Sequence, residues 1–329
     1  MLKAKLGDKK KIVGIGSALI DVLAFENDDF LNSISDIKGG MTLVENDFIE
    51  DVLPKLSQKP EIVPGGAACN SIIGVGRLGG DAEFVGQCGK DEAGTFFEDD
   101  LKKNNVVPQL FKSETVTGRV LSLITPDAQR SMFTHLGASA EIAPSGINAD
   151  CFKDAAIVLI EGYLLFNPDL MMASLKAAKD AGALIAMDLA SFTVVEESKD
   201  FLLNEVMDYI DILIGNEDEA KAFTGHADEA KAIEALAEKA EVAVLKVGAR
   251  GSYISYDGSV TQIAPVSGGK AIDTTGAGDL WAAGFLYGIV SGFSIEKCGE
   301  LASACGFEVV QVTGANIPDD GWKRIKKLL

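Results

Sequence analysis

Short apolar runs alternate with longer amphipathic runs along most of the chain. Several of the short runs are almost continuously apolar, which is typical of strands covered on both faces of a sheet. The runs predicted as strands are 11–16, 82–88, 155–162, 183–189, 211–216 and 242–248. The stretches predicted as helices are 67–78, 91–104, 168–181, 228–239 and 276–290. This alternation predicts an α/β fold with a doubly wound, mostly parallel sheet and helices on both of its faces.

Two segments interrupt this order, at about 23–45 and 106–136. Polar and apolar residues alternate in both, which favours antiparallel hairpins with one solvated face. The hairpins are either ordinary surface features or parts of one small sheet that forms a lid. No linker or repeat divides the chain, so we expect a single domain over 1–329 with these two segments inserted in it.

The composition is that of a globular protein, and its charge limits the partners. Apolar residues make up 47% of the 329 positions, and 30 Lys and Arg face 49 Asp and Glu, for a net charge of −19. Such a balance argues against binding to nucleic acid or to an anionic membrane surface. An anionic ligand remains compatible with it, because backbone amides at a helix N-terminus bind phosphate without any lysine.

Cysteine and histidine usage narrows the chemistry further. The five cysteines are an odd number without a C-x-x-C pair, so we expect reduced thiols and a cytoplasmic protein. The two histidines, His135 and His226, exclude a His-rich zinc site and leave little for a Ser-His-Asp hydrolase. The first residues lack the apolar core of a signal peptide, and the uncharged run 280–295 is too short to span a membrane.

The most informative segment is Asp273-Thr-Thr-Gly-Ala-Gly-Asp279, which precedes a long apolar helical run. Its glycines allow a ligand to approach the backbone amides of Gly276, Ala277 and Gly278, and these amides begin a helix. We call them the anion cradle. Asp279, in the first helical turn, either stabilises the helix dipole or accepts the proton of an alcohol that attacks a phosphate held in the cradle.

Two other patterns resemble nucleotide or metal motifs. Gly74–Gly79 fits G-x-G-x-x-G, but it lies at the end of a predicted helix rather than after a strand, so we interpret it as helix packing and a C-cap. No Walker-type motif occurs. Asn216 and Glu219 follow a predicted strand, where they can form a capping box or approach a hydrated Mg²⁺, and the residues alone favour the cap.

Polar residues near the N-terminus are candidates for binding a sugar. Asp21 lies in an otherwise apolar run, so it is either at a sheet edge or has partners, and a carboxylate can accept hydrogen bonds from both hydroxyls of a diol. Gly65 and Gly66 precede a predicted helix and form either a plain turn or a ligand-binding loop. Asn70 would then face that ligand from one turn inside the helix.

Together these segments resemble the PfkB carbohydrate kinase family, the ribokinase and adenosine kinase group. The matching segments, in the family's order over nearly the whole chain, are GSALIDV, PGGAACN, GRLGG, GQCGKDEAG, NEDE, KVGARG and DTTGAGD. The stretches KGGMTLVE, DAQRSMFTHLGAS and EGYLL look most like bacterial adenosine kinase or sugar kinase members. The resemblance implies a ribokinase-like α/β domain with a small β-sheet lid.

It also implies transfer of the γ-phosphate of ATP to a primary hydroxyl, with Asp279 as catalytic base and the anion cradle beside it. Arg130 matches a lid arginine that can reach the transferred phosphate. The positions implied in acceptor binding are Ser17, Asp21, Gly65, Gly66 and Asn70. Those implied near the nucleotide are Asn216, Lys246, Gly248, Gly251, Val310 and Ala315. Asn216 and Glu219 would organise Mg²⁺ through water, and Asp273 and Thr275 match a monovalent-cation (K⁺) site of some members.

The resemblance leaves the acceptor open. Adenosine kinases usually carry Asn where this chain has Ser17, a shorter side chain without an amide. We expect an adenosine kinase-like enzyme, with a sugar kinase for ribose, fructose or 2-keto-3-deoxygluconate as the alternative. An NAD-dependent oxidoreductase and a catalytically silent sugar sensor are less favoured. An aspartate of ordinary pKa, about 3.9, would act late in the transfer. The expected assembly is a monomer or a homodimer formed through the lid.

Overall fold

The computed structural model describes residues 5–36, 38–127 and 129–329, and it contains two sheets. In spatial order the large sheet consists of β14 (Ser259–Ile263), β13 (Ser252–Tyr256), β12 (Val242–Lys246), β11 (Ile212–Asn216), β10 (Leu184–Asp188), β9 (Ala155–Glu161), β1 (Lys11–Ile15), β5 (Ala82–Gly89) and β6 (Val106–Ser113). Its strands run parallel, apart from β13 and β14. The six strands predicted from apolar runs are confirmed, with ends within two residues of those expected.

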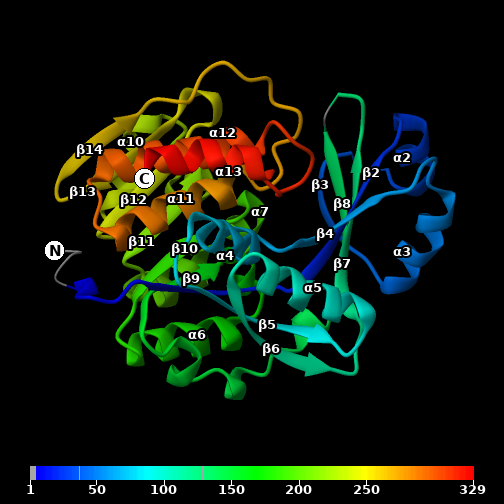
Figure 1. Ribbon diagram of the computed structural model, residues 1–329, viewed down its shortest axis with the longest axis horizontal. Helices are drawn as coiled ribbons and strands as arrows, with labels where there is room; N and C mark the ends of the chain where they lie inside the picture. The colour runs from blue at the N-terminus through cyan, green and yellow to red at the C-terminus, as the bar shows by residue number, and fades with distance from the viewer. Residues whose placement is uncertain (1–4, 37, 128) are drawn as a thin grey trace.

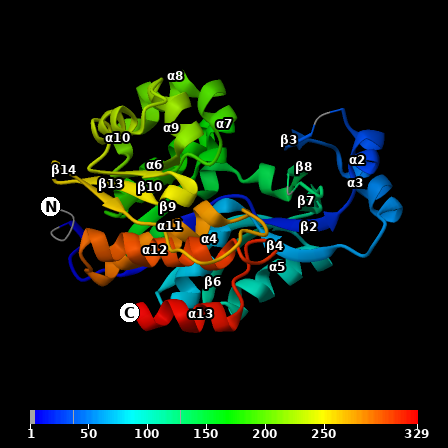
Figure 2. The same cartoon turned by 90° about the horizontal axis from the view of Figure 1, so that it is seen from above.

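Helices cover both faces of the large sheet (Figure 2). One face carries α4 (Ala67–Leu78), α5 (Glu92–Lys103), α11 (Ala277–Ser291), α12 (Ile295–Val309) and α13 (Asp319–Ile325). The other carries α6 (Pro168–Asp180), α7 (Phe192–Glu197), α8 (Lys199–Phe201), α9 (Glu217–Thr224) and α10 (Glu229–Ala237). Neighbouring strand residues enter opposite layers, as Ile12 and Val13 do. The prediction of a doubly wound α/β fold is therefore confirmed.

The small sheet stands beside the large one (Figure 1). Its order is β3 (Gly40–Leu43), β8 (Arg130–Gly137), β7 (Thr117–Ile124), β2 (Leu19–Phe25) and β4 (Glu61–Gly65). The helices α2 (Asp28–Ile34) and α3 (Asn46–Val52) cover one face, where Leu31 and Ile49 pack against alternate strand residues such as Val22, Leu121 and Phe133. We call this the outer face. Asp21, which is expected to bind the acceptor, has the opposite orientation, and we call its side the acceptor face after this expectation.

The hairpins predicted for the two interrupting segments were only partly right. In the first segment, β2 and β3 do not pair, because α2 lies between them; Asn27 caps this helix and Leu31 anchors it. In the second, β6 joins the large sheet parallel to β5, and the antiparallel hairpin is β7 with β8. Alternation indicates strands, but the choice of partner depends on packing between distant segments. Within the described residues, the structure contains no helix with the length and apolar character needed to cross a membrane.

Candidate active site

Asp279 and the anion cradle lie together at the start of α11. Gly276 caps this helix with φ of 72°, a left-handed conformation that favours glycine, and a Cβ there would lie 2.5 Å from the side chain of Ala315. Asn70, in the first turn of α4, donates from Nδ2 to Asp279 Oδ2 at 2.9 Å. The structure thus brings together two predicted site residues that are far apart in the sequence.

The environment of Asp279 changes the acidity expected for it. Burial raises the pKa of its carboxyl to about 7, and the charges of Asp188 and Glu161 act in the same direction. The hydrogen bond from Asn70 and the charge of Lys246 oppose this rise. The expectation of an ordinary pKa was therefore wrong, because the sequence does not reveal the apolar and acidic surroundings. A carboxylate with a pKa near neutrality is better matched to proton transfer from an alcohol.

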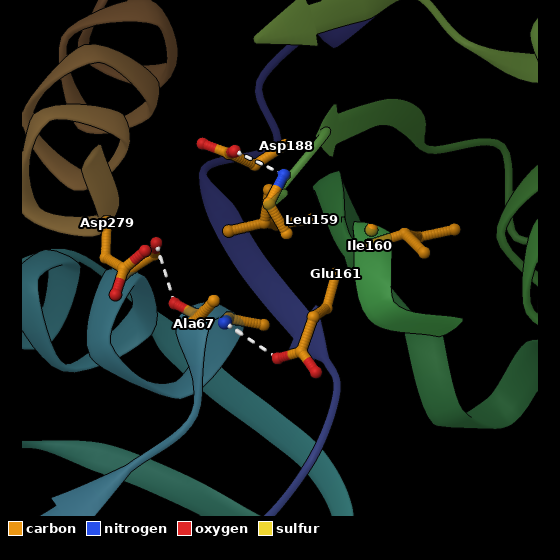
Figure 3. Close-up of a pocket in the computed structure, with 10 residues that line it drawn as sticks. Ala67, Leu159, Ile160, Glu161, Asp188 and Asp279 are labelled. Atoms are coloured by element: carbon orange, nitrogen blue, oxygen red, sulfur yellow. Dashed lines mark hydrogen bonds between the residues drawn. The ribbon is translucent and has the colours of Figure 1, made fainter. Parts of the chain in front are cut away.

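A small pocket separates the carboxylates of three elements (Figure 3). Asp279 enters from α11, Glu161 from the end of β9 and Asp188 from the end of β10. The full lining is Ala67, Ala68, Ser71, Leu159, Ile160, Glu161, Gly162, Asp188, Ala190 and Asp279. The pocket lies at the carboxyl ends of parallel strands and at the N-terminus of α4, where open α/β sheets bind ligands.

Asp21 projects from β2, where burial raises the pKa of its carboxyl to about 6. The charge of Arg130 lowers this pKa and that of Asp273 raises it. Gly65 pairs with β2 so closely that a Cβ there would collide with the Asp21 carboxylate. Gly66 has φ of 104° and caps α4. The backbone before α4 is thus closely approached by neighbouring groups, which requires glycine at both positions.

Ser17 and Glu161 form a contact that sequence reasoning missed. Glu161 is 2% exposed, and its Oε1 accepts hydrogen bonds from the Ser17 hydroxyl at 2.9 Å and from the Ser17 amide at 3.2 Å. Its Oε2 accepts from the Ala68 amide at 3.1 Å, at the start of α4. Burial raises the pKa of Glu161 despite these donors. The Ser17 hydroxyl therefore holds the Glu161 carboxylate in place. In the sequence, a charged residue at the end of an apolar strand was the signal that could have identified Glu161.

Asn216 and Glu219 form the capping box that their spacing predicted. The Asn216 side chain accepts from the Glu219 amide at 3.0 Å, and Glu219 Oε2 accepts from the Asn216 amide at 2.8 Å. Burial raises the pKa of Glu219 to about 7, while the charge of Lys246 lowers it and that of Asp188 raises it. The described residues contain no group of three or more acidic, Cys or His side chains arranged to hold a metal.

Lys246 lies at the end of β12, beside the anion cradle. Its ammonium pairs with Asp188 at 2.8 Å, and the two side chains are 12% and 13% exposed. A Cβ on Gly278 would lie 2.9 Å from the ammonium nitrogen, so the charge rests against the cradle. Sequence analysis did not identify Asp188, although a carboxylate at the end of an apolar strand is a signal for this edge of the sheet.

Arg130 connects the small sheet to the loop before the cradle. It lies at the start of β8, and its guanidinium donates to the Thr275 hydroxyl. Asp273 organises that loop: its Oδ1 accepts from the Thr275 amide and hydroxyl at 2.9 and 2.7 Å, and its Oδ2 accepts from the Gly314 amide at 2.8 Å. On the acceptor face, Leu23 approaches the same Gly314. The small sheet therefore contacts both loops that surround the cradle.

The remaining predicted nucleotide residues lie around this edge. The Val310 carbonyl accepts from the Ile272 amide at 2.7 Å, and Ala315 adjoins Gly276, so both border the cradle loop. Gly248 and Gly251 flank the turn after β12 with φ of 55° and 97°. A Cβ on Gly251 would collide with the Ile263 carbonyl, so the local packing alone explains why this position is glycine. Their contacts with a nucleotide stay predictions.

The pattern Gly74–Gly79 has the structural role that was expected of it. It ends α4, and Gly79 forms the left-handed C-cap with φ of 98°. Gly74 packs against Ala283 of α11, where a Cβ would lie 2.5 Å from the alanine methyl group. The interpretation as helix packing and a C-cap is confirmed.

Comparisons with known proteins agree with this geometry. The model of the family described as "pfkB family carbohydrate kinase" matches residues 9–321. Adenosine kinase 1 of Arabidopsis thaliana is 26% identical over 332 residues, covering 94% of this chain and 96% of the relative. Fructokinase of Escherichia coli is 28% identical over 288 residues, covering 83% and 94%. The crystal structure of adenosine kinase from Sinorhizobium meliloti superposes with a TM-score of 0.89 at 30% identity, covering 98% of this chain and 100% of that one.

Proposed function

The chain belongs to the pfkB family of carbohydrate kinases, and from this premise we propose that it transfers the γ-phosphate of ATP to a primary hydroxyl of a nucleoside. Kinases of this family act on sugar or nucleoside hydroxyls. The observation that carries the proposal is the contact of Asp279, Asn70 and the anion cradle at the start of α11. The Asp279 carboxylate, as the proposed base, lines the pocket there, and the backbone proposed to bind phosphate directly precedes it at the start of the same helix.

In the proposed reaction the acceptor oxygen attacks the γ-phosphorus in line, and its proton passes to an Asp279 carboxylate oxygen. The new O–P bond forms as the bond between the γ-phosphorus and the ADP oxygen breaks, so ADP leaves with that electron pair. Asn70 orients the carboxylate, and burial keeps its pKa near neutrality. The cradle amides and Arg130 stabilise charge on the transferring phosphoryl group, which supplies most of the acceleration in such reactions.

The acceptor face supports a nucleoside rather than a free sugar. Strand register aligns Asp21 with Val120, Thr134 and Leu43 in one row across the sheet. The adjoining row holds Leu23, Ser122, Met132 and Met41. The accessible part of these rows is apolar: Leu43 is 57% exposed, and Met41 and Met132 are half-buried. The other members beside Asp21 are buried, namely Leu23, Val120, Ser122 and Thr134. A flat, weakly polar base can lie on these apolar side chains while Asp21 binds the ribose hydroxyls. A free sugar has no base, so it would leave the apolar side chains uncovered.

Magnesium and a monovalent cation belong to the proposal as well. Mg²⁺ would neutralise charge on the phosphates, and it keeps most of its waters when it binds. Asn216 and Glu219 are the candidates for a role through such waters, because they lie at the end of β11 and the start of α9, close to Lys246. Asp273 and Thr275 are the corresponding candidates for K⁺; Asp273 also accepts a hydrogen bond from the Gly314 amide of the neighbouring loop.

A turnover assay over several acceptors tests the proposed function. ADP release would be measured with adenosine, guanosine, ribose, fructose and 2-keto-3-deoxygluconate, with Asp279→Asn as the inactive control. We expect the highest kcat/KM for a purine nucleoside. A higher kcat/KM for a free sugar would contradict the nucleoside assignment, and activity in Asp279→Asn would contradict the role of the base.

A matched pair of variants tests the acceptor face directly. Leu43 lies on this face, whereas Ile62 has a similar exposure, 51%, on the edge strand β4 in register with Val22 of the outer face. Leu43→Ser should raise KM for the nucleoside severalfold, and Ile62→Ser should leave it unchanged. Equal effects of the two changes would show that the acceptor does not contact the apolar rows.

We also propose that the protein acts as a monomer in the cytoplasm. The helices α2 and α3 already cover the outer face of the small sheet, so this face is not free to pair with a second lid (Figure 1). Sedimentation equilibrium at micromolar concentration should give a mass close to 34.7 kDa. A stable species of twice that mass would favour the homodimer instead.

A further inference from the structure

The ion pair between Asp188 and Lys246 lies beside the anion cradle, and this position indicates a role in nucleotide binding. We propose that Asp188 is a positioning residue, which holds the Lys246 ammonium at the anion cradle so that it contacts the γ-phosphate. This inference rests on the proposed kinase function and assigns a role to a carboxylate that the sequence motifs do not include.

The two residues of the ion pair come from the strands on either side of β11. β10 and β12 flank β11, so Asp188 and Lys246 meet across its carboxyl end, 2.8 Å apart. The second oxygen of Asp188 accepts from the Ala190 amide at 3.1 Å. Ala190 itself has φ of 64°, a left-handed conformation that is uncommon for a residue with a Cβ. The chain thus turns sharply after β10 around the Asp188 carboxylate, which fixes the carboxylate and the lysine paired with it.

The ammonium is held where a phosphate would arrive. It rests against Gly278, one of the residues whose amides form the cradle, and a side chain at that position would displace it. Among acceptors in the described residues, Lys246 donates to Asp188 alone. An ammonium carries three protons, so two remain for a ligand. The Ala277 amide donates to the Thr274 carbonyl at 3.2 Å. The amides of Gly276 and Gly278 and the ammonium can therefore bind the same phosphoryl oxygens from neighbouring directions.

The surrounding charge makes this ammonium necessary for an anionic ligand. Asp188, Glu219 and Asp279 all interact electrostatically with Lys246. Three carboxyl groups around one cation would repel a triphosphate if the cation were absent or displaced. A buried ion pair is seldom more stabilising than apolar side chains of similar size, so fold stability alone does not account for it.

Binding of two nucleotides tests the proposal without requiring a known acceptor. Calorimetric titration with Mg²⁺ would compare AMP-PNP, which carries a γ-phosphate, with ADP, which lacks one. We expect Lys246→Met to reduce the preference for AMP-PNP over ADP at least tenfold, with the affinity for ADP changed less than threefold. Asp188→Asn should reduce the same preference by a smaller factor, because the ammonium remains but loses its anchor.

A double variant and a distant control separate this role from a structural one. Lys246→Met leaves the Asp188 charge buried without its cationic partner and should lower Tm, whereas Lys246→Met with Asp188→Asn should restore Tm but not the AMP-PNP preference. Lys11→Met breaks the half-buried Lys11–Glu83 pair, 3.1 Å long, at the amino ends of β1 and β5, and should lower Tm without changing the preference.

Two results would overturn the proposal while leaving the kinase function intact. These are an AMP-PNP preference that is unchanged in Lys246→Met or in Asp188→Asn, and a preference that returns together with Tm in the double variant. If the wild-type protein bound neither nucleotide, the proposed function would fail as well, and the role of Lys246 with it.

Discussion

Replacement of Asp279 by asparagine should make the protein both inactive and more stable at pH 8. Asparagine has nearly the same shape and retains an oxygen for the Asn70 amide, which now donates at 2.9 Å. What the change removes is a carboxyl group whose pKa burial raises from 3.8 to about 7. The variant therefore isolates the cost of holding a negative charge at the start of α11.

The sign of the stability change follows from proton binding. Between about pH 4 and pH 7 the folded protein binds the Asp279 proton more tightly than the unfolded chain does, so this group's contribution to stability is lost as the pH rises. A pKa difference of about 3 units corresponds to about 4 kcal/mol at pH 8. Because the residue as a whole is half-buried rather than fully buried, we expect about 2 to 4 kcal/mol.

Thermal unfolding at two pH values measures this effect. The unfolding entropy of a 329-residue chain is about 0.7 kcal/mol per kelvin, so Asp279→Asn should raise Tm by about 3 to 6 °C at pH 8. At pH 5 the folded carboxyl is protonated while that of the unfolded chain is mostly ionised, so the gain in Tm should shrink to about 1 to 2 °C. The matched control is Asp169→Asn, at an exposed position in the first turn of α6, which should show no such gain.

The reasoning would be refuted by either of two results. If Asp279→Asn gained no stability at pH 8, the carboxylate would not be desolvated; if it gained equally at both pH values, charge would not be the cause. Activity is the second readout, and kcat should fall at least about a hundredfold, as for loss of a general base. A stable, inactive variant would fit a residue kept for chemistry at the expense of stability.

Three further predictions concern the same site. The kcat/KM of the wild-type protein should rise about tenfold per pH unit up to about pH 7 and then level off, because the Asp279 carboxylate must be deprotonated to accept a proton; a flat profile from pH 5 to 8 would contradict this. Gly276→Ala should lower the free energy of unfolding, measured by urea denaturation, by about 1 to 3 kcal/mol, since alanine would adopt φ of 72° and collide with Ala315; a neutral effect would count against a rigid cradle. Arg130→Met, which loses the contact with Thr275, should increase ATP hydrolysis relative to acceptor phosphorylation, measured as the ratio of inorganic phosphate to ADP; an unchanged ratio would argue against a water-excluding lid.

The large sheet was predictable because its signal is local. Continuous apolar runs such as 155–162 and 242–248 identify buried parallel strands, and the helices between them carry their own caps and spacing. The capping box of Asn216 and Glu219 and the C-cap at Gly79 are also local, since both are formed by residues within one turn. For such features the side chains that decide the structure are neighbours in the sequence.

The errors arose where distant segments decide the outcome. β6 alternates like a lid strand, yet it pairs with β5, because the edge of the large sheet was open to it. Asp188 and Glu161 were not identified as site residues, since only the folded sheet brings the ends of β9 and β10 beside α11. The acidity of Asp279 was misjudged for the same reason: its neighbours Asp188 and Glu161 are far away in the chain.

β2 follows β1 after only three residues, yet it belongs to the other sheet. Asp21, proposed to bind the acceptor, is thus carried by the small sheet, whereas the proposed base Asp279 and the anion cradle begin a helix that covers the large sheet. With this arrangement, sequence changes in the small sheet can alter which acceptor binds while the residues that transfer the phosphoryl group stay the same. Grafting β3, β7 and β8 from a relative of different specificity, with Arg130 retained, should accordingly yield an enzyme with the same chemistry and a new acceptor.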